Sequence, residues 1–233
     1  MDFSGRHVVV TGGTGALGIA VVSALIETGA VCHVPWHTEQ EAEDFPHRGH
    51  RQVVLVGNTG LSDEAGVARL FDGVERLWAS IHLAGGFAMG AVAKTGKAVL
   101  MQQVEMNLVT SFLCCRAAVN RMAGGKEGGR IVNVAARPAL EWRSGAGMAA
   151  YAASKAGVAA LTVALAEEVA KDGILVNAVA PSTMDTPANR KAMPQADHAA
   201  WPKTEEVART ILFLASPDNR VTRGAIVPIY GKA

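Results

Sequence analysis

The chain has 233 residues, of which 49% are hydrophobic, 18% charged and 5% aromatic. This composition supplies enough apolar surface for a large core and an oligomer interface, and it excludes a disordered chain. Lysine and arginine number 22 and aspartate and glutamate 21, giving a net charge of +1. A balance this even argues against nucleic acid or an anionic membrane as a partner.

Three cysteines, Cys32, Cys114 and Cys115, show neither a C-x-x-C motif nor zinc-ligand spacing, so we expect reduced thiols and no metal site. The N-terminal stretch MDFSGRHVVV has no positively charged start or cleavage site of a signal peptide. No apolar run reaches the ~18 residues that span a bilayer. We therefore expect a cytoplasmic protein.

Apolar, strand-like runs alternate with amphipathic helical stretches along the chain. In chain order the pattern predicts a strand at 6–10, a helix at 15–28, a strand at 30–34, a polar stretch at 36–51, a strand at 52–56, a helix near 62–74, a strand at 77–83, a long helix at 97–122, a strand at 130–135, a helix near 148–171, a strand at 174–179, a helix at 204–215 and a strand at 225–230.

This alternation predicts the α/β class, a doubly wound parallel sheet of seven strands with helices on both faces. Runs such as VVLV and IVNV are apolar throughout, as strands covered on both faces are. We expect one Rossmann-type domain over 1–233. The proline-rich segment at about 182–203 follows a strand, where such sheets bind ligands, so we expect a substrate lid there, with an ordered surface loop as the alternative.

The first predicted strand runs into Thr11-Gly12-Gly13-Thr14-Gly15-Ala16-Leu17-Gly18 and then a helix. The three spaced glycines would allow a tight turn at Gly12, backbone approach to a pyrophosphate at Gly15, and close helix packing at Gly18. The free N–H groups of the helix start would bind the phosphates. Thr14 and Leu17, in the same turn, are further cofactor candidates.

The end of the second strand normally reads the adenosine ribose, with Asp favouring NAD and a nearby Arg favouring NADP. This chain has Trp36 and His37 there. Trp36 would stack on adenine and His37 would contact a phosphate, unless both are ordinary loop residues. The sequence therefore does not decide between NAD and NADP.

Tyr151 and Lys155 are four residues apart on a predicted helix, so they share one face. A phenol has a pKa near 10 and is a poor acid–base group at neutral pH. A neighbouring ammonium would lower that pKa and suit Tyr151 to proton transfer.

Over its whole length, the chain resembles the short-chain dehydrogenase/reductase family. The matching segments are TGGTGALG at 11–18, HLAGG at 82–86, Asn107, IVNVAA at 131–136, YAASKAG at 151–157 and NAVAPSTMDTP at 177–187. The resemblance implies an NAD(P)-dependent oxidoreductase in which Tyr151 donates the proton, Lys155 holds the nicotinamide ribose and Asn107 orders a relay water. It further implies cofactor contacts from Leu61, Ala84, Gly85, Gly86, Pro181, Thr183 and Thr186, with Thr186 on the carboxamide.

The departures from the family pattern are also informative. The family's catalytic serine falls at Ala136, which cannot donate a hydrogen bond. Ser144, Ser182 and Thr183 are the hydroxyls that could replace it. Gly60 stands where many members have an adenine-contacting Asp.

One branch of the family, the quinonoid dihydropteridine reductases, also lacks the serine, and the segment from Asp185 to Asp197 with Trp201 resembles it. A quinonoid substrate develops no alkoxide, whereas losing one donor to an oxyanion costs a ketone reductase about 10²–10³ in rate. We therefore expect hydride transfer to a small carbonyl or a quinonoid or imine-like substrate, with a dihydropterin as one candidate. The expected substrate contacts are Phe87, Ala136, Arg137, Met184 and Trp201.

The alternative is a catalytically weak dinucleotide-binding sensor or scaffold, which Ala136 and Gly60 favour and the retained Tyr151, Lys155 and Asn107 oppose. The helix carrying Tyr151 reads AGVAALTVALAEEVA, apolar over more than one face. An exposed apolar face of this kind would mark an interface, so we expect a homo-oligomer, a tetramer or a dimer.

Overall fold

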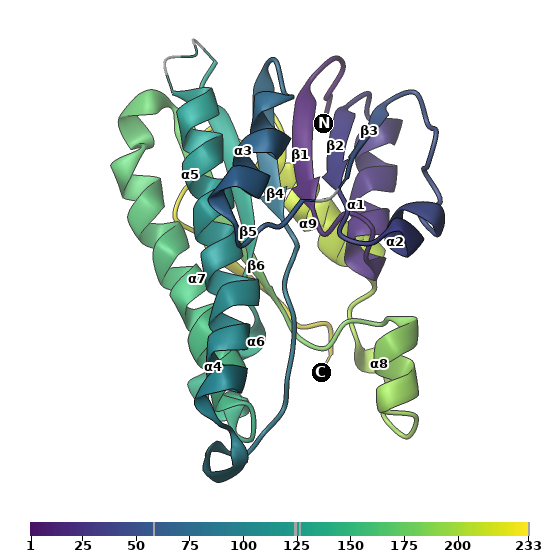
Figure 1. Cartoon of the computed structure of the whole chain (residues 1–233), viewed down its shortest axis with the longest axis vertical. Coiled ribbons are helices and arrows are strands. Elements are labelled where there is room, and N and C mark those ends of the chain that lie inside the picture. Colours follow the sequence, from purple (N-terminus) through teal and green to yellow (C-terminus); the bar gives the residue numbers. More distant parts are fainter. Residues whose placement is uncertain (58, 124, 126, 233) are drawn as a thin grey trace.

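A computed structural model describes residues 1–57, 59–123, 125 and 127–232. Over these residues, seven strands form one parallel sheet in the order β3-β2-β1-β4-β5-β6-β7 (Figure 1). The strands are β1 (His7–Thr11), β2 (Val31–Pro35), β3 (Val53–Val56), β4 (Leu77–His82), β5 (Gly129–Val134), β6 (Ile174–Pro181) and β7 (Ile226–Ile229). The predicted α/β class and its seven parallel strands are confirmed.

Helices cover both faces of the sheet. They are α1 (Ala16–Glu27), α2 (Glu39–Glu43), α3 (Glu64–Asp72), α4 (Lys97–Gln103), α5 (Thr110–Met122), α6 (Arg137–Leu140), α7 (Ala149–Glu168), α8 (Pro187–Ala192) and α9 (Thr204–Ala215). Helices α1 and α9 pack together on one face, while α3, α5 and α7 form the layer on the other. Figure 1 shows α8 apart from both layers.

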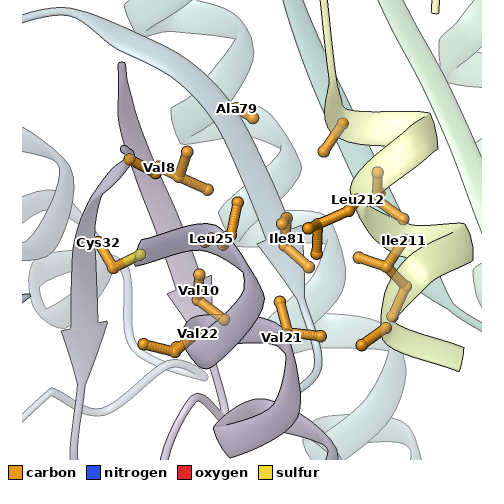
Figure 2. Packing of buried hydrophobic residues seen from close by; sticks show 14 of the residues in the cluster. Val8, Val10, Val21, Val22, Leu25, Cys32, Ala79, Ile81, Ile211 and Leu212 are labelled. Atoms are coloured by element: carbon orange, nitrogen blue, oxygen red, sulfur yellow. The ribbon is translucent and has the colours of Figure 1, made fainter. Parts of the chain in front are cut away.

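Alternation along β1 divides the core into two halves. Val8 and Val10 face α1 and α9, and Val9 faces α3 and α5. Figure 2 shows the first half, where Leu25 of α1 and Ile211 of α9 close over the strands. The apolar strands predicted from the sequence are therefore buried on both sides.

The helical layer differs from the prediction in several places. The expected helix at 97–122 is continuous, but residues Val104–Val109 form a π-helical turn between α4 and α5. The expected helix at 148–171 ends at Glu168 and is followed by a 3-10 turn at Ala170–Asp172. The polar stretch at 36–51 contains the short helix α2, whose N-cap is the hydroxyl of Thr38.

The prediction that no apolar run is long enough to span a bilayer was too strong. Two helical stretches, Lys97–Met122 and Ala149–Glu168, are long and apolar enough by length and composition. Both pack against the sheet or against each other in the fold, as core helices of soluble proteins do. Cys32, Cys114 and Cys115 are free, buried thiols whose burial raises their pKa values.

Candidate active site

The glycine-rich turn after β1 lies beside the end of β4, where the strand order reverses and open α/β sheets bind ligands. Gly12 has φ +67°, and a Cβ there would stand 2.7 Å from the backbone N of Ala84. A side chain at Gly18 would collide with the backbone of Gly12 and Gly13. The expected tight turn is therefore present, but Gly18 packs against the turn itself rather than against the sheet.

The start of α1 can receive an anion. Its N-cap, Gly15, supplies no side-chain hydrogen bond, and its first turn holds no acidic residue. A Cβ at Gly15 would meet only the Gly12 carbonyl oxygen, at 3.4 Å, so the approach is open. Thr14 is half-buried, and the side chain of Leu17 is buried in the core, which leaves its backbone N–H for a ligand. Free N–H groups and the helix dipole together favour a phosphate here.

Trp36 and His37 follow β2, at the end of the crevice expected to hold the adenosine. The Trp36 indole is half-buried and leans on Gly57, where an added Cβ would lie 2.5 Å from a ring carbon. His37 is exposed, and its backbone N–H donates to Glu41 at 3.0 Å. Leu61 is half-buried and packs against the core beneath α3. After His37, the next charged side chain in the described residues is that of Glu39, the first residue of α2.

Gly85, just beyond β4, lies next to two of the expected catalytic residues. An added Cβ would be 2.5 Å from Asn107 Oδ1 and 3.4 Å from Lys155 Nζ. Lys155 is buried, and its ammonium donates to the Val134 carbonyl at the end of β5 at 2.8 Å. The glycine thus allows the π turn at Val104–Val109 and helix α7 to approach the ends of β4 and β5.

The side chain of Asn107 acts as a clamp on Gly86. Its Oδ1 accepts from the Gly86 N–H at 3.0 Å, and its Nδ2 donates to the Gly86 carbonyl at 3.0 Å and to Ser154 Oγ at 3.1 Å. Ser154 in turn donates to the Tyr151 carbonyl at 2.8 Å. The sequence reasoning missed Ser154, although it lies within the Tyr-x-x-x-Lys motif.

Tyr151 is partly buried, with the exposed ring of Phe87 packed edge-on against it at 4.9 Å between centroids. Burial raises the pKa of Tyr151 to about 12 and lowers the pKa of Lys155 to about 8. The expected lowering of the Tyr151 pKa is therefore wrong in direction, because loss of solvent on burial raises this pKa. At neutral pH the phenol is therefore protonated, as a proton donor must be.

Ala136 follows β5 as the N-cap of α6 and is 5% exposed. The next residue, Arg137, is engaged by Glu141 at 2.7 Å and lies over the Tyr230 ring. Of the three candidate replacement hydroxyls, Ser144 donates to the Glu141 carbonyl and Ser182 to the Tyr230 carbonyl. Thr183 makes no hydrogen bond to a described residue, so its hydroxyl is the one available.

In the segment after β6, the main chain of Asp185 pairs with that of Lys203 in an isolated parallel β-bridge, which joins the two ends of the segment. Pro181 is buried at the end of β6. Thr186 caps α8 by accepting from the Asn189 N–H at 3.2 Å, which leaves its own O–H free to donate. Met184 is half-buried, whereas Trp201 is buried and packs on His198 with ring centroids 4.6 Å apart. Trp201 therefore supports the base of this segment.

A buried network of polar side chains links β4, β5 and α5, and the sequence analysis did not predict it. His82 at the end of β4 contacts Ser80 at 2.7 Å and Asn133 of β5 at 2.8 Å, and Cys115 also reaches Asn133. Desolvation lowers the pKa of His82 to about 4, so its ring is neutral at neutral pH. The network joins the end of β4 to β5. In the described residues, no group of three or more His, Cys, Asp or Glu could hold a metal.

Comparisons with known proteins agree with this geometry. A family model described as short chain dehydrogenase matches residues 6–197. Galactitol 2-dehydrogenase of Rhizobium johnstonii is 34% identical over 97% of this chain and 93% of its own length. The (2S)-[(R)-hydroxy(phenyl)methyl]succinyl-CoA dehydrogenase subunit BbsD of Thauera aromatica is 30% identical over 99% and 97%. A solved structure described as ElxO with NADP bound superimposes with a TM-score of 0.87, at 23% identity and 97% coverage of both chains, and shows the shared fold.

Proposed function

Because the chain belongs to the short-chain dehydrogenase/reductase family, we propose that it is a reductase in which Tyr151 delivers the proton to the reduced substrate. The observation that carries the proposal is the convergence of Lys155 and Asn107 around Gly85 beyond the end of β4, with Tyr151 one turn before Lys155 on α7. A scaffold that only bound a dinucleotide would not need a phenol and a buried ammonium one turn apart on α7.

The family membership confirms NAD or NADP as the cofactor, without a preference between them. The open turn at Gly12 and Gly15 and the uncapped start of α1 fit its pyrophosphate. We assign the phosphate end to Thr14, the backbone of Leu17, and Gly18, and the nicotinamide end to Lys155 and the free hydroxyl of Thr186. The remaining proposed contacts are Trp36, His37, Leu61, Ala84, Gly85, Gly86, Tyr151, Pro181 and Thr183. When bound, the nicotinamide supplies the hydride.

The protein's own contribution is to hold and release a proton. The Tyr151 phenol keeps its proton at neutral pH, since burial raises its pKa to about 12. It releases that proton to the atom of the substrate that becomes basic on reduction. Lys155, fixed by the Val134 carbonyl, keeps positive charge next to the site and offsets the developing phenolate.

The missing hydroxyl at Ala136 shapes the proposed substrate class. A ketone gains a full negative charge on oxygen and benefits from two donors, whereas a quinonoid or imine-like acceptor needs one proton at nitrogen. We therefore propose a small carbonyl or quinonoid substrate, with a dihydropterin as a specific candidate. We propose that the substrate contacts Phe87, Met184 and Thr183. Ala136, Arg137 and Trp201 are proposed to pack around these contact residues.

The test is oxidation of NADH and NADPH by the purified protein with quinonoid dihydropterin and with a panel of ketones and aldehydes. Fast turnover of the pterin that is lost in Tyr151→Phe would support the narrower proposal. Turnover of ketones alone would refute the pterin and keep the reductase. The same assay measures the preference between the two cofactors.

A second candidate function is a catalytically weak dinucleotide-binding sensor or scaffold, which Ala136 favours. It predicts tight nucleotide binding with negligible turnover of every acceptor. If Tyr151→Phe turned over an acceptor as fast as wild type, Tyr151 would not be the proton donor. Fluorescence titration with NADH and NADPH alongside the acceptor panel separates these outcomes.

We propose further that the protein is a cytoplasmic homo-oligomer, a dimer or a tetramer, formed as one domain with residues 182–203 as its lid. Exposed apolar side chains along α4, α5 and α7 support the interface: Val99, Leu100, Met101, Phe112 and Val163. Three buried free thiols support a reducing compartment. Light scattering that gave a clean monomer would contradict the assembly.

A further inference from the structure

A surface cavity of about 510 Å³ lies at the amino ends of β5 and β6, opposite the candidate active site at the carboxyl ends of the strands. The described residues that line it include Arg130 of β5, Arg220 and Arg223 of the loop between α9 and β7, and the carboxylate of Glu127. Sites for small molecules have volumes of about 300–1,000 Å³, so this cavity is large enough to hold one.

Arg130 is the buried cation of this cavity, with 7% of its surface exposed. Its Nε and one terminal nitrogen donate to the Asn219 carbonyl at 3.0 and 2.6 Å, and the other terminal nitrogen donates to the Gly129 carbonyl at 2.8 Å. Within the described part of the chain it makes no ion pair, and each terminal nitrogen keeps one N–H without a partner. Buried charged side chains are almost always paired, so this guanidinium has the charge and the free donors to bind an anion.

The surroundings of Arg130 add positive charge. Arg6 and Arg130 both lie over the Trp78 ring, with their guanidinium carbons 3.9 and 4.9 Å from its centroid. Arg6 pairs with Glu127 at 3.0 Å, so this carboxylate of the cavity wall is already engaged. Burial, and then the charge of Arg6, lower the pKa of Arg130. An anion in the cavity would offset this charge.

Arg220 and Arg223 bring two exposed guanidiniums to the same cavity. Arg223 pairs with Glu167 at 3.0 Å, and both partners are solvent-exposed, whereas Arg220 forms no ion pair with any residue that the structure describes. Exposed ion pairs contribute little to stability, so Arg223 can turn toward a ligand at small cost. Val221, between the two arginines, is 85% exposed and leaves an apolar side chain uncovered at the cavity wall.

We infer that this cavity binds the phosphate group of a small phosphorylated molecule. Its three arginines and Glu127 carry a formal charge of +2, which matches a phosphate monoester of charge about −1.5 to −2 at pH 7. A phosphate offers three terminal oxygens to guanidiniums that approach from different elements, whereas one bidentate arginine already fills a carboxylate. The apolar side chains of Leu175 and Val221 would contact the organic part of the ligand. This binding does not depend on the proposed reductase activity.

The test is calorimetric titration of the protein with glycerol 3-phosphate and with inorganic phosphate, with saturating dinucleotide present to fill the crevice at α1. We expect saturable binding that is tighter for the ester, and a Kd about tenfold weaker in Arg220→Gln and in Arg223→Gln, because each variant loses a charge-assisted hydrogen bond. The matched control is Arg209→Gln, which removes an exposed arginine of α9 that does not line the cavity and should leave the Kd unchanged.

Three calorimetric results would overturn the inference. They are no saturable heat beyond that of potassium chloride at equal ionic strength, tighter binding of inorganic phosphate than of the ester, and an equal change of Kd in Arg220→Gln and Arg209→Gln.

A crystal structure of the wild-type protein with glycerol 3-phosphate gives an answer that needs no variant. The expected result is a phosphate group whose oxygens accept from the free N–H groups of Arg130 and from Arg220. A phosphate bound only at the start of α1, or only at exposed arginines without Arg130, would contradict the site.

Discussion

Gly85→Ala is predicted to disable the site by displacing Asn107. The added Cβ would stand 2.5 Å from Asn107 Oδ1, about 1 Å inside ordinary contact distance. Asn107 is 0% exposed and is fixed by two bonds to Gly86 and one to Ser154, so it cannot turn away freely. Moving Oδ1 by that distance breaks its bond from the Gly86 N–H.

The magnitude follows from that bond. A buried hydrogen bond left unmade costs about 1–3 kcal/mol, so the free energy of unfolding should fall by about 2 kcal/mol. For a domain of this size, that corresponds to a melting temperature lower by about 4–8 °C. Because Asn107 is one of the proposed catalytic residues, we expect its displacement to lower kcat by about 10–100-fold.

Gly86→Ala is the matched control, one residue further along. Its Cβ would meet the end of the Met106 side chain, which is flexible and can rotate away. Thermal melting and nicotinamide oxidation, measured on both variants, should therefore separate them clearly. Equal losses in both, or a larger loss in Gly86→Ala, would refute the reasoning from Asn107.

Three further predictions concern the proton and the missing hydroxyl. Tyr151→Phe should lower turnover by about 10³-fold while nucleotide binding persists, with Tyr230→Phe, the only other tyrosine, as an active control. Burial lowers the pKa of Lys155 from 10.5 to about 8, so the unfolded chain binds more protons between these values. The free energy of unfolding of wild type should therefore rise relative to Lys155→Met over that pH range, and urea melts showing a constant difference would contradict this. Ala136→Ser should raise ketone reduction by about 10–100-fold and leave a quinonoid acceptor unaffected, and equal rates for ketones would count against the oxyanion argument.

The sheet could be predicted from the sequence because its strands are apolar throughout and separated by helical patterns. The short helices could not. In α2 only Ala42 is buried, and in α8 no residue is, so neither leaves a hydrophobic period to detect. The π turn at Val104–Val109 is equally invisible, because a shift of backbone hydrogen bonding by one residue changes no side-chain composition.

In the site, predictions within one element succeeded better than predictions across elements. The spacing of Tyr151 and Lys155 places both on α7, as expected. The clamp between Asn107 and Gly86 depends on how α4 and the π turn after it pack against α7 and the end of β4. Burial also reverses the expected shift in the pKa of Tyr151, because the sequence gives the neighbouring charge but not the loss of solvent.

That reversal bears on the direction of the reaction. A phenol with a pKa of about 12 is protonated at neutral pH, which is the starting state for reduction. Oxidation of an alcohol would need the phenolate instead, a minor species under these conditions. Lys155 reinforces the asymmetry, since its lowered pKa means that its positive charge is lost at the alkaline pH where phenolate would form. Under the proposed function, the partly buried Tyr151 and the buried Lys155 therefore suit reduction near neutral pH, and a substrate that accepts a proton at nitrogen would use that state without the hydroxyl absent from Ala136.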